Sequence, residues 1–413
     1  MQNLTTTTLA ILIAAICGNA ASAAAPKILH DFGLGSQASG SSLYASLLLD
    51  SAGNLYGTAE FGGVYNRGVV FRLSKNVTGP WTETVLHNFK GGTSDGETSH
   101  ASVVMDEAGN LYGTTTAGGT GACPQGCGVL FQLTPTASGP WTETIVHQFA
   151  GGSDGAQPYS SVIFDAPGNL YGATTAGGSH NAGVVYKLTP AGPGLWNETV
   201  IYNFLGSPDA ATPWAAPVFD AAGHLYGITA NGGANGKGAI YGLAPQPDGS
   251  WKESVLHSFI PSTDGSDLFE SLVLDDSGNL YGSAETGGSA NCGVAFELAK
   301  ETNGWTFKVL HNFLGVAAQD GENPNALVFD ALGNLYGTSV GGGVDNPGTI
   351  FKLTPQSSGG WTESVLYNFT GGNDGAYPSV PLVIGPAGHL YGTTLWGGPA
   401  GDTTGGVAFE FTP

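Results

Sequence analysis

One phrase, Gly-Asn-Leu-Tyr-Gly or a close variant of it, recurs through the chain at almost constant spacing. The tyrosine of its Leu-Tyr-Gly core stands at positions 56, 112, 171, 226, 281, 336 and 391, so the intervals are 56, 59, 55, 55, 55 and 55 residues. Seven copies at one period of this length indicate an array of like supersecondary units. The repeat runs nearly from end to end of the 413 residues, so it predicts one repetitive domain.

Residues 141–196 show the content of one unit. Four runs, each typical of a strand, are separated by Gly-rich breaks. The Asp-Ala-Pro-Gly-Asn segment at 165–169 predicts a tight hairpin turn between the second and third runs. A four-stranded antiparallel sheet cannot bury both of its faces alone, whereas radial packing of such sheets around an axis does so in a β-propeller. The four runs are 141–149, 161–165, 170–175 and 183–188.

The two ends of the chain favour a closed ring. The last unit stops at residues 406–413 and lacks the Trp-led strand that should follow, while residues 26–32 match the end of that missing strand. Closure also hides strand edges that would otherwise invite aggregation. We therefore predict one all-β domain, a seven-bladed β-propeller over residues 26–413, in which the N-terminal strand completes blade 7.

The repeat also predicts which strands and loops surround the axis. The strand that ends at Asp165 is innermost (strand a), and the Leu-Tyr-Gly strand (b), the Gly-Val-Val strand (c) and the Trp-led strand (d) follow outward. The d-to-a and b-to-c loops then share one rim, and the tight a-to-b turns lie on the other. We expect any ligand at the first rim, because its loops are long enough to bind something.

Charge and targeting signals restrict the class of protein. With 11 basic and 32 acidic residues the net charge is −21, which disfavours nucleic acid as a partner. Residues 1–25 resemble a secretory signal, with an apolar run at 9–17 and an Ala-Ser-Ala cleavage site at 21–23. No later segment is long and apolar enough to span a membrane. We expect an exported, monomeric protein of the periplasm or the extracellular medium.

The cysteines fit an oxidising compartment. Cys123 and Cys127 stand in Cys-Pro-Gln-Gly-Cys within a local insertion, which predicts a small loop disulfide in an exported protein. Cys292 is left over and is interpreted as a buried small apolar residue. No second ligand pair stands near Cys123 and Cys127, and no cofactor motif is present, so we expect neither a metal nor a cofactor.

The repeat resembles the GloVer-type tandem repeat of exported bacterial proteins, which occur with varied C-terminal anchors. The resemblance rests on Asp-x-x-Gly-Asn-Leu-Tyr-Gly-Thr-Thr, a Gly-Gly pair, Gly-Val-Val-Phe-Lys-Leu-Thr-Pro and Trp-Thr-Glu-Thr-Val-Leu-His-Asn-Phe, and it covers essentially the whole mature chain. It implies export and supplies no catalytic residues. The chain departs from the family pattern because it ends at Pro413 without an anchor, which implies release in soluble form.

Residues that repeat in the blades are interpreted as structural. We expect the Tyr of Leu-Tyr-Gly to pack between blades and the Trp of strand d to pack at the rim. The recurrent Asp-Gly of the d-to-a loops is explained by a local Asx turn, and calcium is the less favoured alternative. The strand d histidines belong to different blades and are not expected to share a metal; they are His30, His87, His147, His257 and His311.

Positions that differ between blades are better candidates for a site. One such position lies where each innermost strand begins, close to the axis, and Trp396 stands on the same rim. An aromatic plug of the channel mouth is one interpretation, and an aromatic-lined pocket for a carbohydrate or a peptide is the other. The residues at the mouth are Tyr44, His100, Tyr159, Trp214, Phe269, Asn325 and Ser379.

Catalysis is the alternative to binding. Glu60 and Glu285 replace the Thr or Ala of other blades near this rim, and His100 stands at the mouth. Paired carboxylates suit glycoside hydrolysis, and a His with an acid suits a polysaccharide lyase. No Ser-His-Asp elbow, HExxH or phosphate loop is present. We therefore favour a binding or interaction module over an enzyme, with a structural envelope or matrix protein as a third hypothesis.

Overall fold

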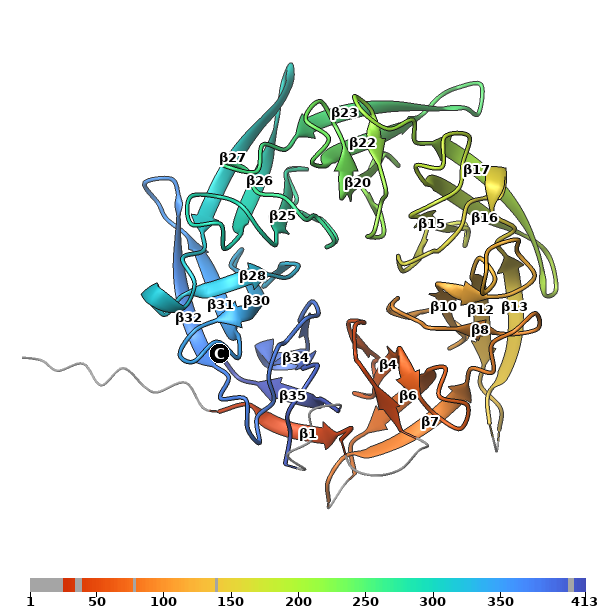
Figure 1. Cartoon of the computed structure of the whole chain (residues 1–413), viewed down its shortest axis with the longest axis horizontal. Helices are drawn as coiled ribbons and strands as arrows, with labels where there is room; N and C mark the ends of the chain where they lie inside the picture. The colour runs from red at the N-terminus through yellow and green to blue at the C-terminus, as the bar shows by residue number, and fades with distance from the viewer. Residues whose placement is uncertain (1–24, 34–38, 77–78, 138–139, 400–404) are drawn as a thin grey trace, which may run out of the picture.

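The computed structural model describes residues 25–33, 39–76, 79–137, 140–399 and 405–413. The predicted signal segment therefore lies, apart from Ala25, outside the described residues. Seven antiparallel sheets surround one axis in the order of the sequence (Figure 1). The chain is a seven-bladed β-propeller, and the prediction of fold class is confirmed.

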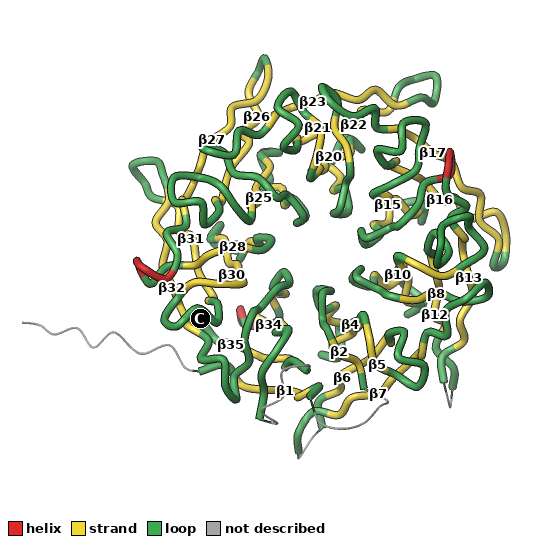
Figure 2. Tube along the Cα trace, viewed as in Figure 1, coloured by secondary structure: helices red, strands yellow, loops and turns green. Residues whose placement is uncertain are grey.

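The third blade shows the strand order that the repeat predicts. From the axis outward it contains β14 (Ile163–Phe164), β15 (Leu170–Thr174), β16 (Val184–Gly192) and β17 (Leu195–Asn203), hydrogen-bonded in that order. The innermost strand is shorter than the predicted run of 161–165, because only two of its residues pair with β15. Figure 2 shows the same alternation of strands and long loops in every blade.

The other blades repeat this arrangement. Blade 1 contains β3 (Leu48–Leu49), β4 (Leu55–Ala59), β6 (Val69–Ser74) and β7 (Thr82–Asn88). Blade 2 contains β9 (Val104–Met105), β10 (Leu111–Thr115), β12 (Val129–Thr134) and β13 (Thr142–Gln148). Blade 4 contains β19 (Val218–Phe219), β20 (Leu225–Thr229), β22 (Ala239–Pro245) and β23 (Trp251–Ser258). Blade 5 contains β24 (Val273–Leu274), β25 (Leu280–Ala284), β26 (Val294–Glu301) and β27 (Gly304–Asn312).

Blade 6 contains β29 (Val328–Phe329), β30 (Leu335–Gly342), β31 (Thr349–Pro355) and β32 (Trp361–Asn368). Blade 7 is built from both ends of the chain. Its strands are β33 (Val383–Ile384), β34 (Leu390–Thr393), β35 (Val407–Phe411) and β1 (Lys27–Asp31). Strand β1 pairs antiparallel with β35, with Lys27 opposite Glu410, and lies at the outer edge of the blade (Figure 1). The predicted closure by the N-terminal strand is confirmed.

Short strand pairings connect the loops on the rim that carries the d-to-a and b-to-c loops, called the pocket rim below. The described rim strands are β2 (Gly40–Ser41) with β5 (Phe61–Gly62), β8 (Gly96–Glu97) with β11 (Ala117–Gly118), β18 (Ala210–Ala211) with β21 (Asn231–Gly232), and β28 (Gly321–Pro324) with β30. Single bridges occupy the same place in blades 3, 5 and 7. Three 3-10 turns complete the described elements: η1 (Gly152–Asp154), η2 (Val316–Ala318) and η3 (Pro386–Gly388). Each d-to-a loop is thereby fixed to the b-to-c loop of its blade.

The glycine of Leu-Tyr-Gly is required by packing inside each blade. In blade 1 Gly57 lies opposite Phe71 of the neighbouring strand, and Phe71 is fully buried. A Cβ at Gly57 would lie 2.5 Å from Cζ of that ring, closer than carbon atoms approach. The aromatic ring on strand c therefore covers the glycine of strand b, which explains why the two residues recur together.

The Asp-x-x-Gly-Asn-Leu-Tyr turn is explained by one carboxylate. Oδ1 of Asp50 accepts from the N–H groups of Ala52 and Asn54, at 2.9 and 2.8 Å. Oδ2 accepts from Nδ2 of Asn54 at 2.8 Å and from the hydroxyl of Tyr56 at 3.1 Å. Burial alone would raise the pKa of Asp50, but these donors lower it overall. The same Tyr packs between blades as predicted, with the ring of Tyr56 6.2 Å from that of Trp141.

Candidate functional site

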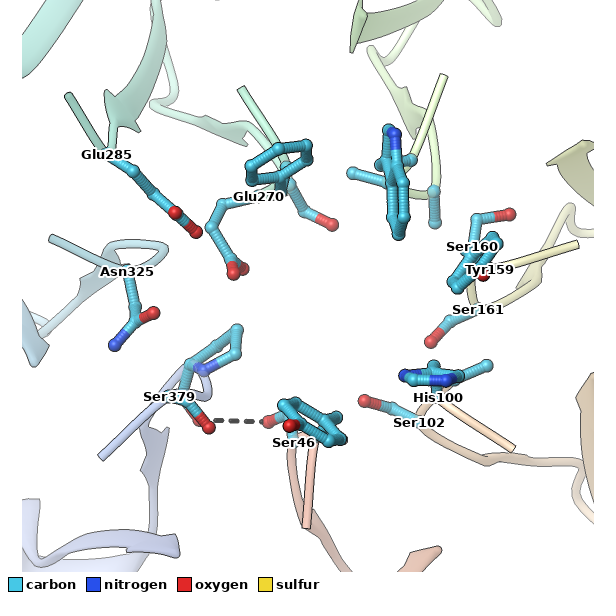
Figure 3. Close-up of a pocket in the computed structure, with 18 of the residues that line it drawn as sticks. Ser46, His100, Ser102, Tyr159, Ser160, Ser161, Glu270, Glu285, Asn325 and Ser379 are labelled. Carbon is cyan, nitrogen blue, oxygen red and sulfur yellow. Dashed lines mark hydrogen bonds between the residues drawn. The ribbon is translucent and has the colours of Figure 1, made fainter. Parts of the chain in front are cut away.

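A cavity of about 410 Å³ opens on the axis at the end where the d-to-a loops enter the innermost strands. All seven residues that the sequence places at the mouth of these strands line it, so the structure brings the predicted set together (Figure 3). The rings do not fill this space, which argues against a simple plug. The seven are Tyr44, His100, Tyr159, Trp214, Phe269, Asn325 and Ser379.

An unusual backbone conformation delivers each of these side chains to the axis. In all seven blades the residue two positions earlier has a positive φ, although none of the seven is glycine. Thr98 has φ 62° and Thr212 has φ 59°, a region that is unfavourable for a β-branched residue. Backbone strain of this kind, of order 1–3 kcal/mol for each residue, is concentrated at functional sites in proteins. The seven residues are Ser42, Thr98, Gln157, Thr212, Asp267, Asn323 and Tyr377.

Five of the lining residues form a continuous arc of rings across blades 1 to 5. The centroid separations are 5.3 Å from Tyr44 to His100 and 5.1 Å from His100 to Tyr159. They continue at 4.1 Å from Tyr159 to Trp214 and 5.2 Å from Trp214 to Phe269. These are ordinary separations for interacting aromatic pairs. Five of the seven mouth residues therefore form one aromatic wall of the pocket.

Glu60 lies beside one end of this arc. Its Oε1 is 3.4 Å from Nε2 of His100, and both side chains are largely buried. Burial, and after it the charge of Glu60, raises the pKa of Tyr44 and of Tyr159. The structure thus brings two of the three predicted catalytic candidates, His100 and Glu60, into contact.

Glu285, the third candidate, lies across the pocket with Glu270 (Figure 3). Burial, and then the charge of Glu285, raises the pKa of Glu270 from 4.5 to about 8, while a hydrogen bond from the backbone of Ala326 opposes the shift. Burial and then Asp267 raise the pKa of Glu285 to about 7. The pocket that carries the aromatic arc therefore also holds two carboxyl groups whose pKa values are raised to neutral pH or above.

Glu270 occupies a place that the other blades give to a small residue. The position directly after the mouth residue is filled elsewhere by alanine, serine or valine, all buried. Glu270 carries the one ionisable side chain in this set. The sequence places it near this rim, and its departure from the small residue of the other blades is the signal that would have assigned it to the site. The equivalent residues are Ala45, Ala101, Ser160, Ala215, Ala326 and Val380.

A layer of serines was also missed. Ser46, Ser102, Ser161 and Ser271 each stand two residues after a mouth residue and line the same cavity (Figure 3). Since alternate residues of an extended chain point the same way, the spacing of two would have found them. One of their hydroxyl groups is engaged, because Oγ of Ser46 donates to the carbonyl of Pro381 at 3.1 Å. The pocket therefore combines aromatic faces, carboxyls and hydroxyls.

Three predicted roles are corrected or refined by the structure. Trp396 is not among the residues that line the cavity; it is half-exposed, and the centroid of its ring lies 5.0 Å from that of Tyr377. Asn325 is buried, and its Nδ2 donates to the carbonyl of Pro378 at 2.7 Å, so it also supports the wall. Cys292 is half-buried rather than buried, because it lies in a rim loop.

The remaining cysteines and the loop aspartates are placed clearly. Cys123 and Cys127 form a disulfide. The loop aspartates do more than the predicted Asx turn, because they bond backward to the end of strand d. Oδ2 of Asp95, for example, accepts from the N–H of Lys90 at 2.8 Å.

The sequence matches the Gloeobacter/Verrucomicrobia repeat over residues 20–163, 121–319 and 215–413, which together span nearly the whole chain. The chain belongs to this repeat family. A search of curated proteins gave no match. In the described part of the chain no helix is long and apolar enough to cross a membrane.

Several solved structures share the fold at low identity. PorZ, a surface component of the type-IX secretion system of Porphyromonas gingivalis, is 14% identical with a TM-score of 0.54, covering 91% of this chain and 48% of PorZ. A candidate 6-phosphogluconolactonase from Bacteroides uniformis is 16% identical with a TM-score of 0.51, covering 84% and 88%. An ulvan lyase from a new family of polysaccharide lyases is 14% identical with a TM-score of 0.50, covering 82% and 85%. At these identities the likeness shows the propeller fold alone.

Proposed function

We propose that this protein is an exported binding module whose axial pocket takes a carbohydrate. The observation that carries the proposal is the unbroken arc of five rings from Tyr44 to Phe269 along one wall of a cavity of about 410 Å³. Aromatic faces stack on the C–H faces of sugar rings, and a few polar groups orient them. The serine layer and the carboxyl groups of Glu270 and Glu285 supply such groups in the same cavity.

The cost of Glu270 supports a ligand rather than a plug. A buried carboxyl lowers stability unless it is compensated, and six other blades place a small residue there. Residues that break a local rule are concentrated at functional sites. A protonated Glu270 donates a hydrogen bond, so a hydroxyl or carbonyl oxygen of the ligand is the matching group.

Binding is tested by calorimetric titration and thermal shift with a panel of oligosaccharides and polysaccharides. We expect one sugar to raise the melting temperature of the protein by mass action, and Trp214→Ala to weaken its affinity at least tenfold. Trp396→Ala is the matched control, because Trp396 lies on the same rim outside the pocket and should bind as the parent does. If no member of a broad panel binds, or if both variants lose affinity equally, the proposal fails.

A peptide ligand is the second source of the same chemistry, since it also offers apolar faces and carbonyl oxygens. A panel of unstructured peptides in the same titration separates the two. Export is tested independently by fractionation of cells that express the full chain, with the protein expected outside the cytoplasm.

Catalysis is a second candidate, and the pair Glu270 and Glu285 favours it. A carboxylic acid with a pKa of about 8 can protonate a leaving group at neutral pH, and a neighbouring carboxylate can act as base or nucleophile. His100 with Glu60 offers a base on the opposite wall for a lyase reaction. An enzyme releases oligosaccharides from the bound polymer and loses this with Glu270→Gln, whereas a binding module releases none. A purely structural protein tolerates Trp214→Ala, Glu270→Gln and His100→Ala alike.

A further inference from the structure

A polar group lies between neighbouring blades in the outer layer of the ring, away from the pocket. At most junctions it contains a His or Tyr near the end of strand d, an Asp from the loop that follows, and a Glu from strand d of the next blade. Between blades 1 and 2 these are His87 of β7, Asp95 and Glu143 of β13. The strand d histidines lie in different blades and do not meet one another; their partners are carboxylates of the following loop and of the next blade.

The first junction differs from a hydrogen-bonded network. Nε2 of His87 lies 3.4 Å from Oδ2 of Asp95 and 3.5 Å from Oε1 of Glu143. Neither Nε2 of His87 nor Oε1 of Glu143 has a hydrogen-bond partner among the described residues, although both atoms are buried. A buried polar atom without a partner costs about 1–3 kcal/mol. These two atoms and Oδ2 of Asp95 lie close together, and the group leaves a place for a positively charged occupant.

The separations match the coordination shell of a small divalent metal. With metal–nitrogen and metal–oxygen distances of about 2.0–2.2 Å, neighbouring ligands of a tetrahedral zinc ion lie about 3.4 Å apart. One imidazole and two carboxylates are also a ligand set that zinc accepts. We propose that His87, Asp95 and Glu143 form a zinc site that joins blades 1 and 2, with the fourth coordination position left to water.

The surroundings hold these ligands in place. Asp95 is buried, and its two oxygens accept from the N–H groups of Lys90 and Gly96 at 2.8 and 2.6 Å. The ring of His87 contacts that of Phe89 at 4.9 Å with an interplanar angle of 72°. Contacts of this kind orient metal ligands and are part of a site.

The other junctions explain why this one is favoured. Among the described residues, two groups bring three ligand atoms within 4.8 Å of one another, and the second is His311, Asp320 and Glu363. There His311 already hydrogen-bonds Asp320 at 2.9 Å, so a metal would first have to replace that bond. We therefore assign the tighter site to the first junction.

Two further junctions are natural controls. Tyr202 occupies the place of His87 between blades 3 and 4, and its hydroxyl donates to Asp209 at 2.9 Å. Phe307 occupies the place of Glu143 between blades 4 and 5, and its ring stacks on His257 at 4.1 Å. His87→Tyr and Glu143→Phe therefore introduce side chains that the fold already accepts in the same register.

The test is calorimetric titration of the chelator-treated protein with zinc chloride, with calcium and manganese chlorides as comparators. We expect one saturable zinc site, weaker binding of the other two ions, and a rise in melting temperature with zinc alone. His87→Tyr and Glu143→Phe should each weaken zinc binding at least tenfold. His257→Tyr, at the junction without a Glu, should bind as the parent does.

Each result decides the proposal. Loss of binding in both junction variants with retention in His257→Tyr supports it, and Cys292→Ser should also retain binding because the free thiol is not a ligand. If the parent shows no saturable zinc binding, or if the junction variants bind as tightly as the parent, the proposal is overturned. If a junction variant fails to fold, the other one and the parent's ion preference still decide it, and two equivalents bound with one lost in His311→Tyr would add the second junction.

Discussion

Carboxyl groups on the two rims of the propeller have opposite environments: hydrogen-bond donors surround them on one rim, and partial burial raises their pKa values on the other. On the a-to-b rim, Asp275 accepts four hydrogen bonds, from Ser277, from both nitrogens of Asn279 and from Tyr281. On the pocket rim, Glu270 and Glu285 are partly buried in the same cavity wall, and their pKa values rise to about 8 and about 7. The turn of the a-to-b rim repeats almost unchanged in six blades, whereas the pocket rim differs from blade to blade.

The difference separates a rim whose polar groups have matched partners from a rim that carries raised pKa values and strained backbone. A turn that recurs with every donor matched stabilises each blade on its own. The pocket rim varies between blades, raises the pKa values of its carboxyl groups and holds seven non-glycine residues at positive φ. These features lower the stability of the folded protein. Such a loss of stability is expected where a ligand compensates for it, which supports the pocket rim as the place of the proposed site. The predictions below test the two halves of this comparison.

The largest effect is expected at the turn. Asp275→Ala leaves four donors without their acceptor and should lower the free energy of unfolding by about 2–4 kcal/mol. The measurement is urea unfolding followed by tryptophan fluorescence. The variant should still bind any pocket ligand once folded, because the turn lies on the opposite rim.

The neighbouring residue gives the matched control. Asp276 is exposed in the same turn, so Asp276→Ala should leave the unfolding midpoint almost unchanged. An equal loss in both variants would mean that net charge, rather than the four hydrogen bonds of Asp275, determines the effect, and the contrast between the rims would lose its basis.

The fold was largely predictable because the repeat is strong. The spacing of the Leu-Tyr-Gly tyrosines gave the number of blades, and the match between residues 26–32 and the missing strand gave the closure. The length of strand a was not predicted. Only Ile163 and Phe164 of the predicted run pair with β15, near the crowded axis. The rim pairings were missed because their Gly-rich segments resemble loops in sequence.

The site was predictable as a ring and not as a set of contacts. Counting along the repeat found Trp214 and its equivalents. In a ring of like blades, residues at the same position of each repeat lie at the same distance from the axis and on the same rim. It included Trp396, which lies on the same rim but is not among the lining residues, and it left Glu270 out of the site because a glutamate near a loop resembles a solvated charge. Partners from neighbouring blades, such as Glu143 with His87, have no signal in the spacing of one blade.

The second prediction concerns the pocket rim. Glu270→Ala restores the small residue of the other blades and should raise the free energy of unfolding, by about 2 kcal/mol at pH 8.5 and by less at pH 5. The folded state holds a proton on Glu270 up to about pH 8, whereas the unfolded chain releases it near 4.5. The stabilising contribution of this proton is therefore present below pH 4.5 and is lost as the pH rises through 8.

Unfolding curves of both proteins at pH 5 and 8.5 measure the effect. Glu322→Ala, a rim glutamate outside the pocket lining, is the control and should show no comparable gain at high pH. If the Glu270→Ala variant is more stable and still binds the ligand of the parent, the carboxyl group of Glu270 is not required for binding. A variant that is less stable than the parent at pH 8.5 would contradict the assigned cost.

The smallest effect is expected from the backbone at the entrance to the pocket. Thr98 has φ 62°, and the equivalent Asn323 has φ 56°. Because Asn tolerates this region better than a β-branched residue does, Thr98→Asn should raise the free energy of unfolding by about 0.5 kcal/mol, and Asn323→Thr should lower it. The reverse substitution also removes the hydrogen bond from Nδ2 of Asn323 to the carbonyl of Glu285, so its loss should exceed the gain at Thr98. Differential scanning calorimetry of the two variants measures both changes in stability. Changes of the same sign in both variants would show that positive φ at this position carries no cost. Backbone strain would then no longer distinguish the pocket rim from the a-to-b rim.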